Sequence, residues 1–372
     1  MGASSADDNR TLILCVVLIP LLSFYVLSYI SLRWGTLCRL RSSLASPLQR
    51  SYRVIGHRGS KLEGFSENTL PAFKRAVSIP VDVVELDVWL TLDGHVVVFH
   101  DGVFGRMCGG KEGHVNRTAY KDLPAVVGDQ PPDGGGGKMG KEEGRADTST
   151  KIPLFSEVLE SLPPSMGLIV EFKENTDELV SKVHELLKKH NRTTNGTTVW
   201  FSLKWKTNKK LRNFDSTIPT ICSVEELLIS LVLYYLWLLP FVSLNHDIFG
   251  LPSFEINPPT LKSWVPFLPM WLCHVLNMFL GGKPSAFFNV PKLVAHLKSR
   301  GYPTWVLGVK DEQEVDFVKS VGASGALSDL PEWLKTTFEK KNVFEDDEDK
   351  SNTVGGGVTQ TKPTVQQKTN RI

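Results

Sequence analysis

From residue 52 onward, short apolar segments alternate with segments whose apolar residues recur at helical spacing. The apolar segments are short and rich in Val, Ile and Phe, so each predicts a buried strand. Strands that are apolar almost throughout are typical of a parallel sheet that helices cover on both faces. The chain is therefore expected to adopt an α/β fold.

The number of predicted strands favours one α/β architecture over another. The predicted strands are YRVIGH, VDVVELDV, HVVVFH, GLIVEF, TTVWFSL, IPTICS, YPTWVLGV and ASGALSD. The predicted helices between them are NTLPAFKRAVS, with Asn68 or Thr69 as its cap, PLFSEVLESL, TDELVSKVHELLKKH and PKLVAHLKSR. Strands in this number favour a closed (β/α)8 TIM barrel, and a doubly wound open sheet is the alternative. AFFNV, residues 286–290, is a further strand candidate.

Residues 11–32, TLILCVVLIPLLSFYVLSYISL, contain no charged side chain and follow a tail of residues 1–10. A helix of about 20 apolar residues crosses the hydrocarbon core of a bilayer. A signal peptide would begin with a positive segment and have a shorter apolar run, whereas Asp7, Asp8 and Arg10 precede this long one. We therefore predict a transmembrane helix, and an integral membrane protein of the endoplasmic reticulum or another endomembrane.

Two signals disagree about the side of the membrane on which the rest of the chain lies. The positive-inside rule favours the cytosol, because a series of arginines follows the apolar segment: Arg33, Arg39, Arg41, Arg50 and Arg53. Three glycosylation sequons favour the lumen, at Asn116, Asn191 and Asn195. The side is left open, with the cytosol preferred.

Two later stretches, residues 227–244 and 264–282, also lack Lys, Arg, Asp and Glu. Each is about long enough to span a bilayer, and their aromatic residues suit the boundary between lipid and water. Both ends of residues 227–282 must return to one barrel. We therefore prefer an apolar, membrane-dipping hairpin to two independent spans, and a pair of buried barrel helices is the alternative.

Two polar segments are predicted to lie outside the packed barrel. Residues 128–150 are rich in glycine, which indicates a flexible surface loop. Residues 338–372, which include EDDEDK and GGGVTQTKP, are predicted to form a disordered tail.

Carboxylates interrupt the apolar segment VVELDVWLTLDGHVVVFHD, residues 83–101. Glu85 and Asp87 are two residues apart, so in a strand they point to the same face. Burying two carboxylates together is costly unless a cation or hydrogen bonds compensate. Asp93-Gly94 is a turn signal, and either a hairpin there or a crossover to a parallel strand brings His100 close to Asp87.

Polar residues also end two other predicted strands. His57 ends the first, and Glu171 and Lys173 share one face near the end of GLIVEFKEN. In α/β barrels the catalytic groups occupy the carboxyl ends of the strands, so this placement predicts an active site. Each of these residues has a structural alternative. His100 could be a core histidine, Asp101 a cap, and Glu171 with Lys173 an ion pair. The joint pattern over several strand ends nevertheless favours a functional site.

The residue types indicate the chemistry of this site. Three carboxylates form a hard oxygen site that suits Mg²⁺ or Ca²⁺. Two histidines can act as general acid and general base. Arg58 and Lys173 can neutralise phosphate oxygens. Together these groups predict metal-assisted cleavage of a phosphodiester.

The motifs GHRG, ENTLPAF, VELDVWLTLDGHVVVFHD and VEFK together resemble the glycerophosphodiester phosphodiesterase family over residues 52–335. The resemblance implies a (β/α)8 barrel that uses a divalent ion, with a family insertion at residues 102–150. It implies His57 and His100 as the acid/base pair and Glu85, Asp87 and Glu171 as metal ligands. The residues implied to contact phosphate or support the site are Arg58, Glu67, Lys173 and Trp305. Gly308 stands where the family has the asparagine of W-T-V-N, and Ser328-Asp329 where it has T-D.

The N-terminal anchor and the apolar insertion are similar to the membrane-bound animal branch of this family with lysophospholipase D activity. The expected substrates are lysophosphatidylcholine or N-acyl lysophosphatidylethanolamine, cleaved to lysophosphatidic acid and the free alcohol. Hydrolysis of soluble glycerophosphodiesters to glycerol 3-phosphate is the alternative, followed by a phospholipase C-like reaction. A non-enzymatic membrane scaffold is disfavoured because both histidines and all three carboxylates are present. The net charge of +2 gives no reason to expect a nucleic-acid partner, and the sequence leaves protein partners open.

Overall fold

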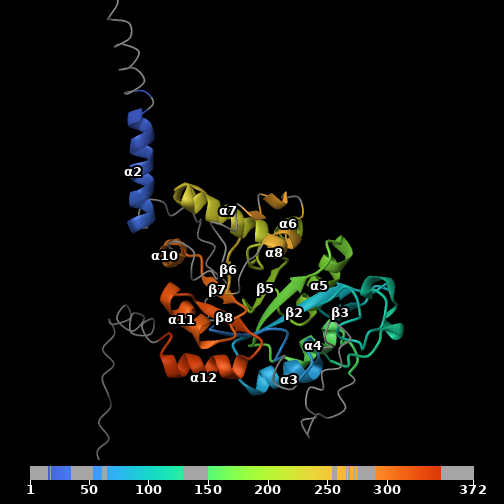
Figure 1. Cartoon of the computed structure of the whole chain (residues 1–372). Coiled ribbons are helices and arrows are strands. Elements are labelled where there is room, and N and C mark those ends of the chain that lie inside the picture. The colour runs from blue at the N-terminus through green and yellow to red at the C-terminus, as the bar shows by residue number, and fades with distance from the viewer. Residues whose placement is uncertain are drawn as a thin grey trace, which may run out of the picture.

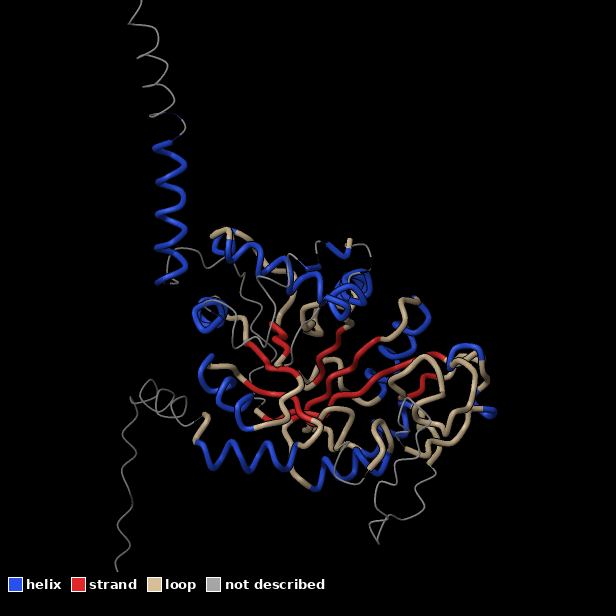
Figure 2. The backbone as a smooth tube through the Cα atoms, in the orientation of Figure 1, coloured by secondary structure: helices blue, strands red, loops and turns tan. Residues whose placement is uncertain are grey.

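The computed structural model has a parallel sheet at its centre with helices packed around it (Figure 1; Figure 2). It describes residues 16, 18–34, 53–60, 65–128, 150–253, 258–264, 266, 269–271, 273–274 and 290–344. The strands are β1 (Val54–Gly56), β2 (Val83–Leu90), β3 (Val96–Val98), β4 (Gly167–Phe172), β5 (Thr198–Phe201), β6 (Phe249–Pro252), β7 (Thr304–Leu307) and β8 (Gly325–Ser328). Their order is β5-β4-β2-β1-β8-β7-β6, and β3 pairs with β2 off this path.

Isolated parallel bridges carry the sheet from β5 to β6. Trp200 in β5 pairs with Thr220, and Ile221 pairs with Ile248 directly before β6. The segment around these two residues thus takes the remaining position between β5 and β6, and the parallel strands form a TIM-like barrel rather than an open sheet. The predicted strand IPTICS is present only as these bridges.

The strand β6 has no counterpart among the strands predicted from sequence. Gly250 and Pro252 interrupt its apolar pattern, and both residue types argue against a strand. A Cβ atom on Gly250 would lie 3.0 Å from Ile221 and 3.1 Å from Leu307, so the glycine permits close packing. The strand candidate at 286–290 is wrong at Val290, which begins helix α10, and its other residues lie outside those described.

The helices that cover the barrel follow the predicted periodicity where a prediction was made. They are α3 (Leu70–Ser78), α4 (Phe155–Ser161), α5 (Asp177–Lys189), α6 (Trp205–Phe214), α7 (Val224–Tyr235), α8 (Pro258–Trp264), α10 (Val290–Ser299), α11 (Glu312–Val321) and α12 (Pro331–Lys341). Thr69 caps α3 through its side-chain oxygen, which accepts a hydrogen bond from the Ala72 amide. Between the two cap candidates, the structure therefore selects Thr69.

The first half of the apolar insertion packs on the barrel. In α7, Leu227, Leu231 and Tyr234 are buried against the core, which fits the alternative of a barrel helix. The outer side of the same helix remains apolar, with Ile229 55% and Val232 47% exposed. Of residues 264–282, the structure describes only 264, 266, 269–271 and 273–274.

Helix α2 (Ile19–Trp34) lies against the segment that follows α7 (Figure 1). Phe24 stacks on Phe241 of the 3-10 turn η4 (Leu239–Phe241), with ring centroids 5.0 Å apart, and Tyr29 meets Trp237 at 5.7 Å. Among the described residues, none of the helices has the combination of length and apolar character needed to cross a membrane. Residues 11–15 and 17 of the predicted span lie outside the described residues.

The first part of the predicted insertion at 102–150 has a small hydrophobic core of its own. It contains the 3-10 turns η2 (Val115–Arg117) and η3 (Tyr120–Asp122). The core residues are Val97, Phe99, Phe104, Met107, Cys108, Val115, Val126 and Ile152. Residues 129–149, which hold most of the predicted flexible loop, lie outside the described residues.

The folded chain continues beyond the boundary predicted for the tail. Helix α12 runs to Lys341, Phe338 is buried, and the rings of Phe338 and Phe344 meet edge to face at 5.1 Å. The prediction of disorder from Phe338 is therefore wrong for these residues, and residues 345–372 lie outside those described.

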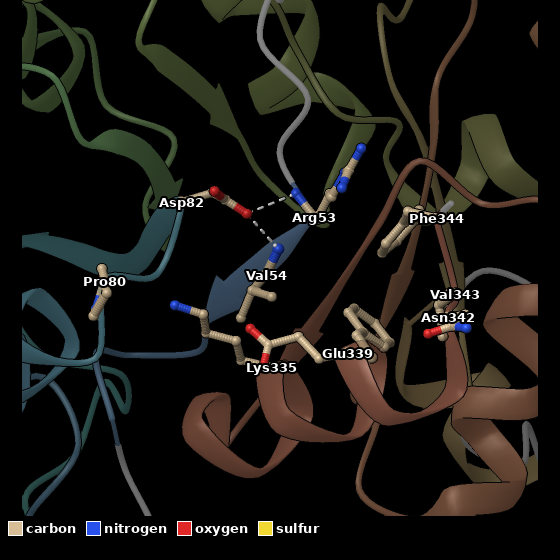
Figure 3. Close-up of a pocket in the computed structure, with 10 residues that line it drawn as sticks. Arg53, Val54, Pro80, Asp82, Lys335, Glu339, Asn342, Val343 and Phe344 are labelled. Carbon is tan, nitrogen blue, oxygen red and sulfur yellow. Dashed lines mark hydrogen bonds between the residues drawn. The ribbon is translucent and has the colours of Figure 1, made fainter. Parts of the chain in front are cut away.

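A pocket lies at the amino end of β1, lined in part by Arg53, Lys335 and Glu339 (Figure 3). The Asp82 carboxylate accepts hydrogen bonds from the amides of Arg53 at 2.9 Å and Val54 at 2.8 Å. These contacts fix the start of the barrel. Because catalytic groups of such barrels lie at the opposite, carboxyl end of the strands, this pocket is structural.

Candidate active site

Four neighbouring strands, β4, β2, β1 and β8, bring charged side chains to the same end of the barrel. Their carboxyl ends carry Glu171, Asp87, His57 and Asp329 respectively. The parallel pairing aligns Asp87 directly with Glu171 and places Ser328 beside Gly56. The ends of β1, β2 and β4 are among those that the sequence predicts to meet, and the end of β8 joins them, so the four ends cover one half of the barrel mouth.

Three buried carboxylates form the centre of this group. Glu85, Asp87 and Glu171 each offer an oxygen, and these oxygens lie within 4.8 Å of one another. Burial raises the pKa of Glu85 well above its ordinary value, and the charges of Asp87 and Glu171 raise it further. A set of hard oxygen donors that repel one another fits a divalent cation, which would relieve the repulsion.

Two cations already compensate part of this negative charge. The Lys173 Nζ atom lies 2.8 Å from both Asp87 Oδ1 and Glu171 Oε1, and Arg58 Nε lies 3.4 Å from Asp87 Oδ2. Burial opposes ionisation of Asp87, but Lys173 and Arg58 outweigh it and hold the pKa of Asp87 below its ordinary range. Asp87 is therefore ionised, while the charge shared by the three carboxylates raises the pKa of Glu85.

The ring of His57 is oriented by a carboxylate that follows β8. The distance from His57 Nδ1 to Asp329 Oδ1 is 2.5 Å. An ionised carboxylate can only accept, so Nδ1 carries the proton and Nε2 is left for chemistry. Nε2 lies 3.8 Å from Glu85 Oε2, beside the carboxylate group. Burial lowers the pKa of His57, and the positive charge of Arg58 lowers it further against the opposing effect of Asp329.

The ring of His100 is also oriented by an aspartate, Asp101. The β2–β3 connection is a hairpin, in which Val88 pairs with Val98 and the Phe99 amide donates to the Asp87 carbonyl. The hairpin therefore ends with His100 near Asp87, as one of the two predicted geometries requires. His100 Nδ1 lies 2.6 Å from Asp101 Oδ1, so Asp101 orients the ring and is more than a cap.

The turn after β1 is tight and unusual in its backbone. A Cβ atom on Gly56 would lie 2.4 Å from the Gly59 carbonyl oxygen, so only glycine fits there. Arg58 and Asn68 adopt left-handed φ angles of 51° and 55°, and the Asn68 amide donates to the Arg58 carbonyl at 3.0 Å. Strained residues of this kind gather at functional sites. Here the turn allows the Arg58 amide to donate to Glu85 Oε2 at 3.0 Å.

The remaining predicted residues have supporting positions. Glu67 is buried and accepts a hydrogen bond from Arg58 NH1 at 2.9 Å. Trp305 is only 2% exposed, and its pairing partners in the flanking strands are Gly250 and Gly325. Trp305 is therefore part of the hydrophobic core.

The structure brings to this group four residues for which the sequence predicts no site role. They are Asn68, Asp101, Arg106 and Asp329. The Asn68 side chain donates to Asp87 Oδ2 at 2.7 Å. In the sequence, Asp101 stands in the motif VFHD and Asp329 in the pair Ser328-Asp329, but neither motif by itself indicates a contact with a histidine. Arg106 lies inside the insertion, where no pattern in the sequence separates it from a surface arginine.

This fold and site define a hydrolase. Two histidines, each with Nε2 left for proton transfer, lie beside a carboxylate group that fits a divalent ion and beside two cations that suit phosphate. The residues 57–333 match the sequence pattern of the Glycerophosphoryl diester phosphodiesterase family.

Similar proteins agree with this match. Human Lysophospholipase D GDPD1 is 31% identical over 322 residues, which cover 84% of this chain and 93% of that protein. Mouse Lysophospholipase D GDPD3 is 29% identical, with 88% of this chain and 93% of that protein covered. A solved structure of an Oleispira antarctica phosphodiesterase in complex with the product sn-glycerol-3-phosphate has a similar fold. Its TM-score is 0.55 at 20% identity, over 77% of this chain and 96% of that one.

The chain belongs to the glycerophosphoryl diester phosphodiesterase family, and it is a phosphoric diester hydrolase.

Proposed function

We propose that this enzyme is a lysophospholipase D that converts lysophosphatidylcholine or N-acyl lysophosphatidylethanolamine to lysophosphatidic acid and the free alcohol. The observation that carries the proposal is an apolar surface beside the barrel. It is made by the exposed side of α7, by the segment Leu236–Phe241, and by α2, which packs on that segment. The names of the human and mouse relatives support the same substrate class.

The position of the apolar insertion also supports a lipid substrate. The connection from β6 to α10 starts at the carboxyl end of β6, which is the end of the barrel that carries the site. Its described residues Met270 and Trp271 are 44% and 66% exposed. A one-chain lipid that enters the site from a bilayer needs an apolar path at this end of the barrel, whereas a soluble diester does not.

In the proposed reaction the two histidines move protons. One accepts the proton of the glycerol 2-hydroxyl as its oxygen attacks phosphorus, and the other donates a proton to the departing alcohol as the phosphorus–oxygen bond breaks. Water then opens the cyclic phosphate. Arg58 and Lys173 supply positive charge for the phosphate oxygens. Glu85, Asp87 and Glu171 would hold Mg²⁺ or Ca²⁺, which would stabilise negative charge on the phosphate.

The test compares two substrates on the purified full-length protein. We expect kcat/KM for lysophosphatidylcholine to exceed that for glycerophosphocholine, with lysophosphatidic acid and choline identified by mass spectrometry. A preference for glycerophosphocholine would replace the proposal with soluble diester hydrolysis. Release of monoacylglycerol and phosphocholine would indicate a phospholipase C-like reaction instead.

We also propose that the enzyme is held on an endomembrane, such as the endoplasmic reticulum, by the segment that includes α2. The support is the uncharged sequence of residues 11–32 and the exposed apolar side chains of α2, among them Leu22 at 66%. Protease protection of tags at both termini in intact microsomes tests the side. Glycosylation at Asn191 or Asn195, both on exposed positions, would place the barrel in the lumen.

A further inference from the structure

A single guanidinium from the insertion contacts two acidic groups of the site. Arg106 Nε donates to Asp101 Oδ2 at 2.8 Å, and its NH2 donates to Glu67 Oε1. Asp101 uses its other oxygen to hold His100, and Glu67 accepts a hydrogen bond from Arg58. Arg106 thus stands one contact away from an acid/base histidine and one contact away from a phosphate-binding arginine.

The insertion holds Arg106 firmly in this place. Its neighbours Phe104, Met107 and Cys108 are each 2% exposed and belong to the small core beside the barrel. The backbone around Arg106 is therefore fixed by packing in a core that it shares with Val97 of β3 and with Phe99. The Arg106 side chain itself is 31% exposed, so small solutes can reach its position.

We propose that Arg106 is a positioning residue that sets His100 through Asp101 and Arg58 through Glu67. The planar fork of arginine reaches two acidic partners with different nitrogens, which a lysine ammonium cannot do in the same geometry. Without the fork, Asp101 loses the donor that fixes the rotation of its carboxylate, and His100 loses its fixed direction. The inference rests on phosphodiester hydrolysis at this site.

The test measures kcat and KM of Arg106→Ala and Arg106→Lys on the same substrate as the wild-type enzyme. We expect kcat of Arg106→Ala to fall about 10²-fold, because small misplacements of catalytic groups cost this much. KM should change less than kcat, and added guanidinium chloride should restore part of kcat, whereas sodium chloride at equal ionic strength should not. Arg106→Lys should stay well below wild type. The control is Arg117→Met, an exposed arginine of the same insertion, whose kcat should match wild type.

The route of the effect is tested by combining Arg106→Ala with Asp101→Asn. If Arg106 acts through Asp101, the double variant should lose little more kcat than the worse single variant. A folded Arg106→Ala with wild-type kcat would overturn the inference, and so would a loss that guanidinium does not restore. Wild-type enzyme that cleaves no phosphodiester would instead defeat the proposed function, so the two failures are distinct.

Discussion

At the scale of single residues, the two histidines are oriented by the same kind of contact. Each has its Nδ1 against an aspartate, at 2.5 Å for His57 with Asp329 and 2.6 Å for His100 with Asp101. Both rings are therefore held in the tautomer that leaves Nε2 for the substrate. Asp329 directly follows the barrel strand β8, whereas Asp101 follows the hairpin strand β3, so two different parts of the fold align the two proton-transfer groups.

The first prediction concerns this alignment at His57. Asp329→Asn keeps the size of the side chain but can donate to Nδ1, which favours the wrong tautomer. We expect kcat to fall about 10²-fold to 10⁴-fold while the unfolding transition stays close to wild type. The control is Asp316→Asn, an exposed residue paired with Lys341 on the surface. Wild-type kcat in a folded Asp329→Asn protein would show that Asp329 does not orient His57.

The second prediction concerns the repulsion among the carboxylates. Because burial and two like charges raise the pKa of Glu85, its ionised form destabilises the metal-free fold at neutral pH. Glu85→Gln should raise the free energy of unfolding by about 1–3 kcal/mol in excess EDTA at pH 7. The same variant should lose activity and the rise in melting temperature that Mg²⁺ or Ca²⁺ gives the wild type. The control is Glu112→Gln on the exposed surface. It should change neither the free energy of unfolding nor the activity, and it should keep the rise in melting temperature that the metal gives.

The third prediction concerns the buried His296, which is not one of the site residues. Burial, together with the positive charge of Arg300, lowers the pKa of His296 from 6.5 to about 4. Above pH 6.5 the ring is neutral in both states, so the fold keeps its full stability. As the pH falls from 6.5 towards 4, His296 is protonated in the unfolded chain but stays neutral in the folded chain. The free energy of unfolding therefore decreases.

This loss belongs to His296 and should disappear with it. His296→Leu should therefore lose up to about 3 kcal/mol less than wild type between pH 7 and pH 4.5, measured by urea unfolding. The matched control is His95→Leu, which changes an exposed histidine. If wild type and His296→Leu lose stability in parallel, His296 is not the group that resists protonation.

At the scale of elements, helix α7 packs one side on the barrel core and exposes an apolar side to the surface. Ser223 caps the helix by accepting from the Glu226 amide, while Glu226 accepts from the Ser223 amide. This capping box fixes where the helix starts and which side faces the core. The uncharged stretch from residue 227 predicts a membrane-dipping hairpin, with a buried barrel helix as the alternative. Its first part, in α7, packs Leu227, Leu231 and Tyr234 against the core and has an apolar outer side.

The fourth prediction tests this cap. Ser223→Ala removes the acceptor for the Glu226 amide, and we expect a loss of about 1 kcal/mol in the free energy of unfolding. Ser320→Ala, at the exposed end of α11, is the matched control and should cost less. A loss at Ser223 no greater than at Ser320 would mean that the cap does not secure α7.

At the scale of the whole molecule, the charged half of the barrel mouth and the apolar surface suit the two parts of a lysophospholipid. The fifth prediction tests the apolar surface apart from the charged site. It combines Ile229→Ser, Val232→Ser and Leu236→Ser, which change three side chains in and directly after α7 that are about half exposed. The ratio of kcat/KM for vesicle-bound lysophosphatidylcholine over glycerophosphocholine should fall about tenfold or more, because apolar contact with the bilayer is lost. Leu92→Ser, which changes a 67% exposed residue of the β2–β3 turn, should leave the ratio unchanged. An unchanged ratio in the triple variant would remove this face from substrate entry.

The sequence by itself determined the class of fold and the centre of the site. Apolar strands alternating with helices required a buried parallel sheet, and Glu85, Asp87, His100 and Glu171 stood out because charged groups in apolar strands are costly without a function. Only the tertiary structure decided how the barrel passes from β5 to β6 and which aspartates hold the histidines. Those contacts join residues far apart in the chain, such as His57 and Asp329. No local pattern of residues records them, because parallel pairing and packing alone bring the strand ends together.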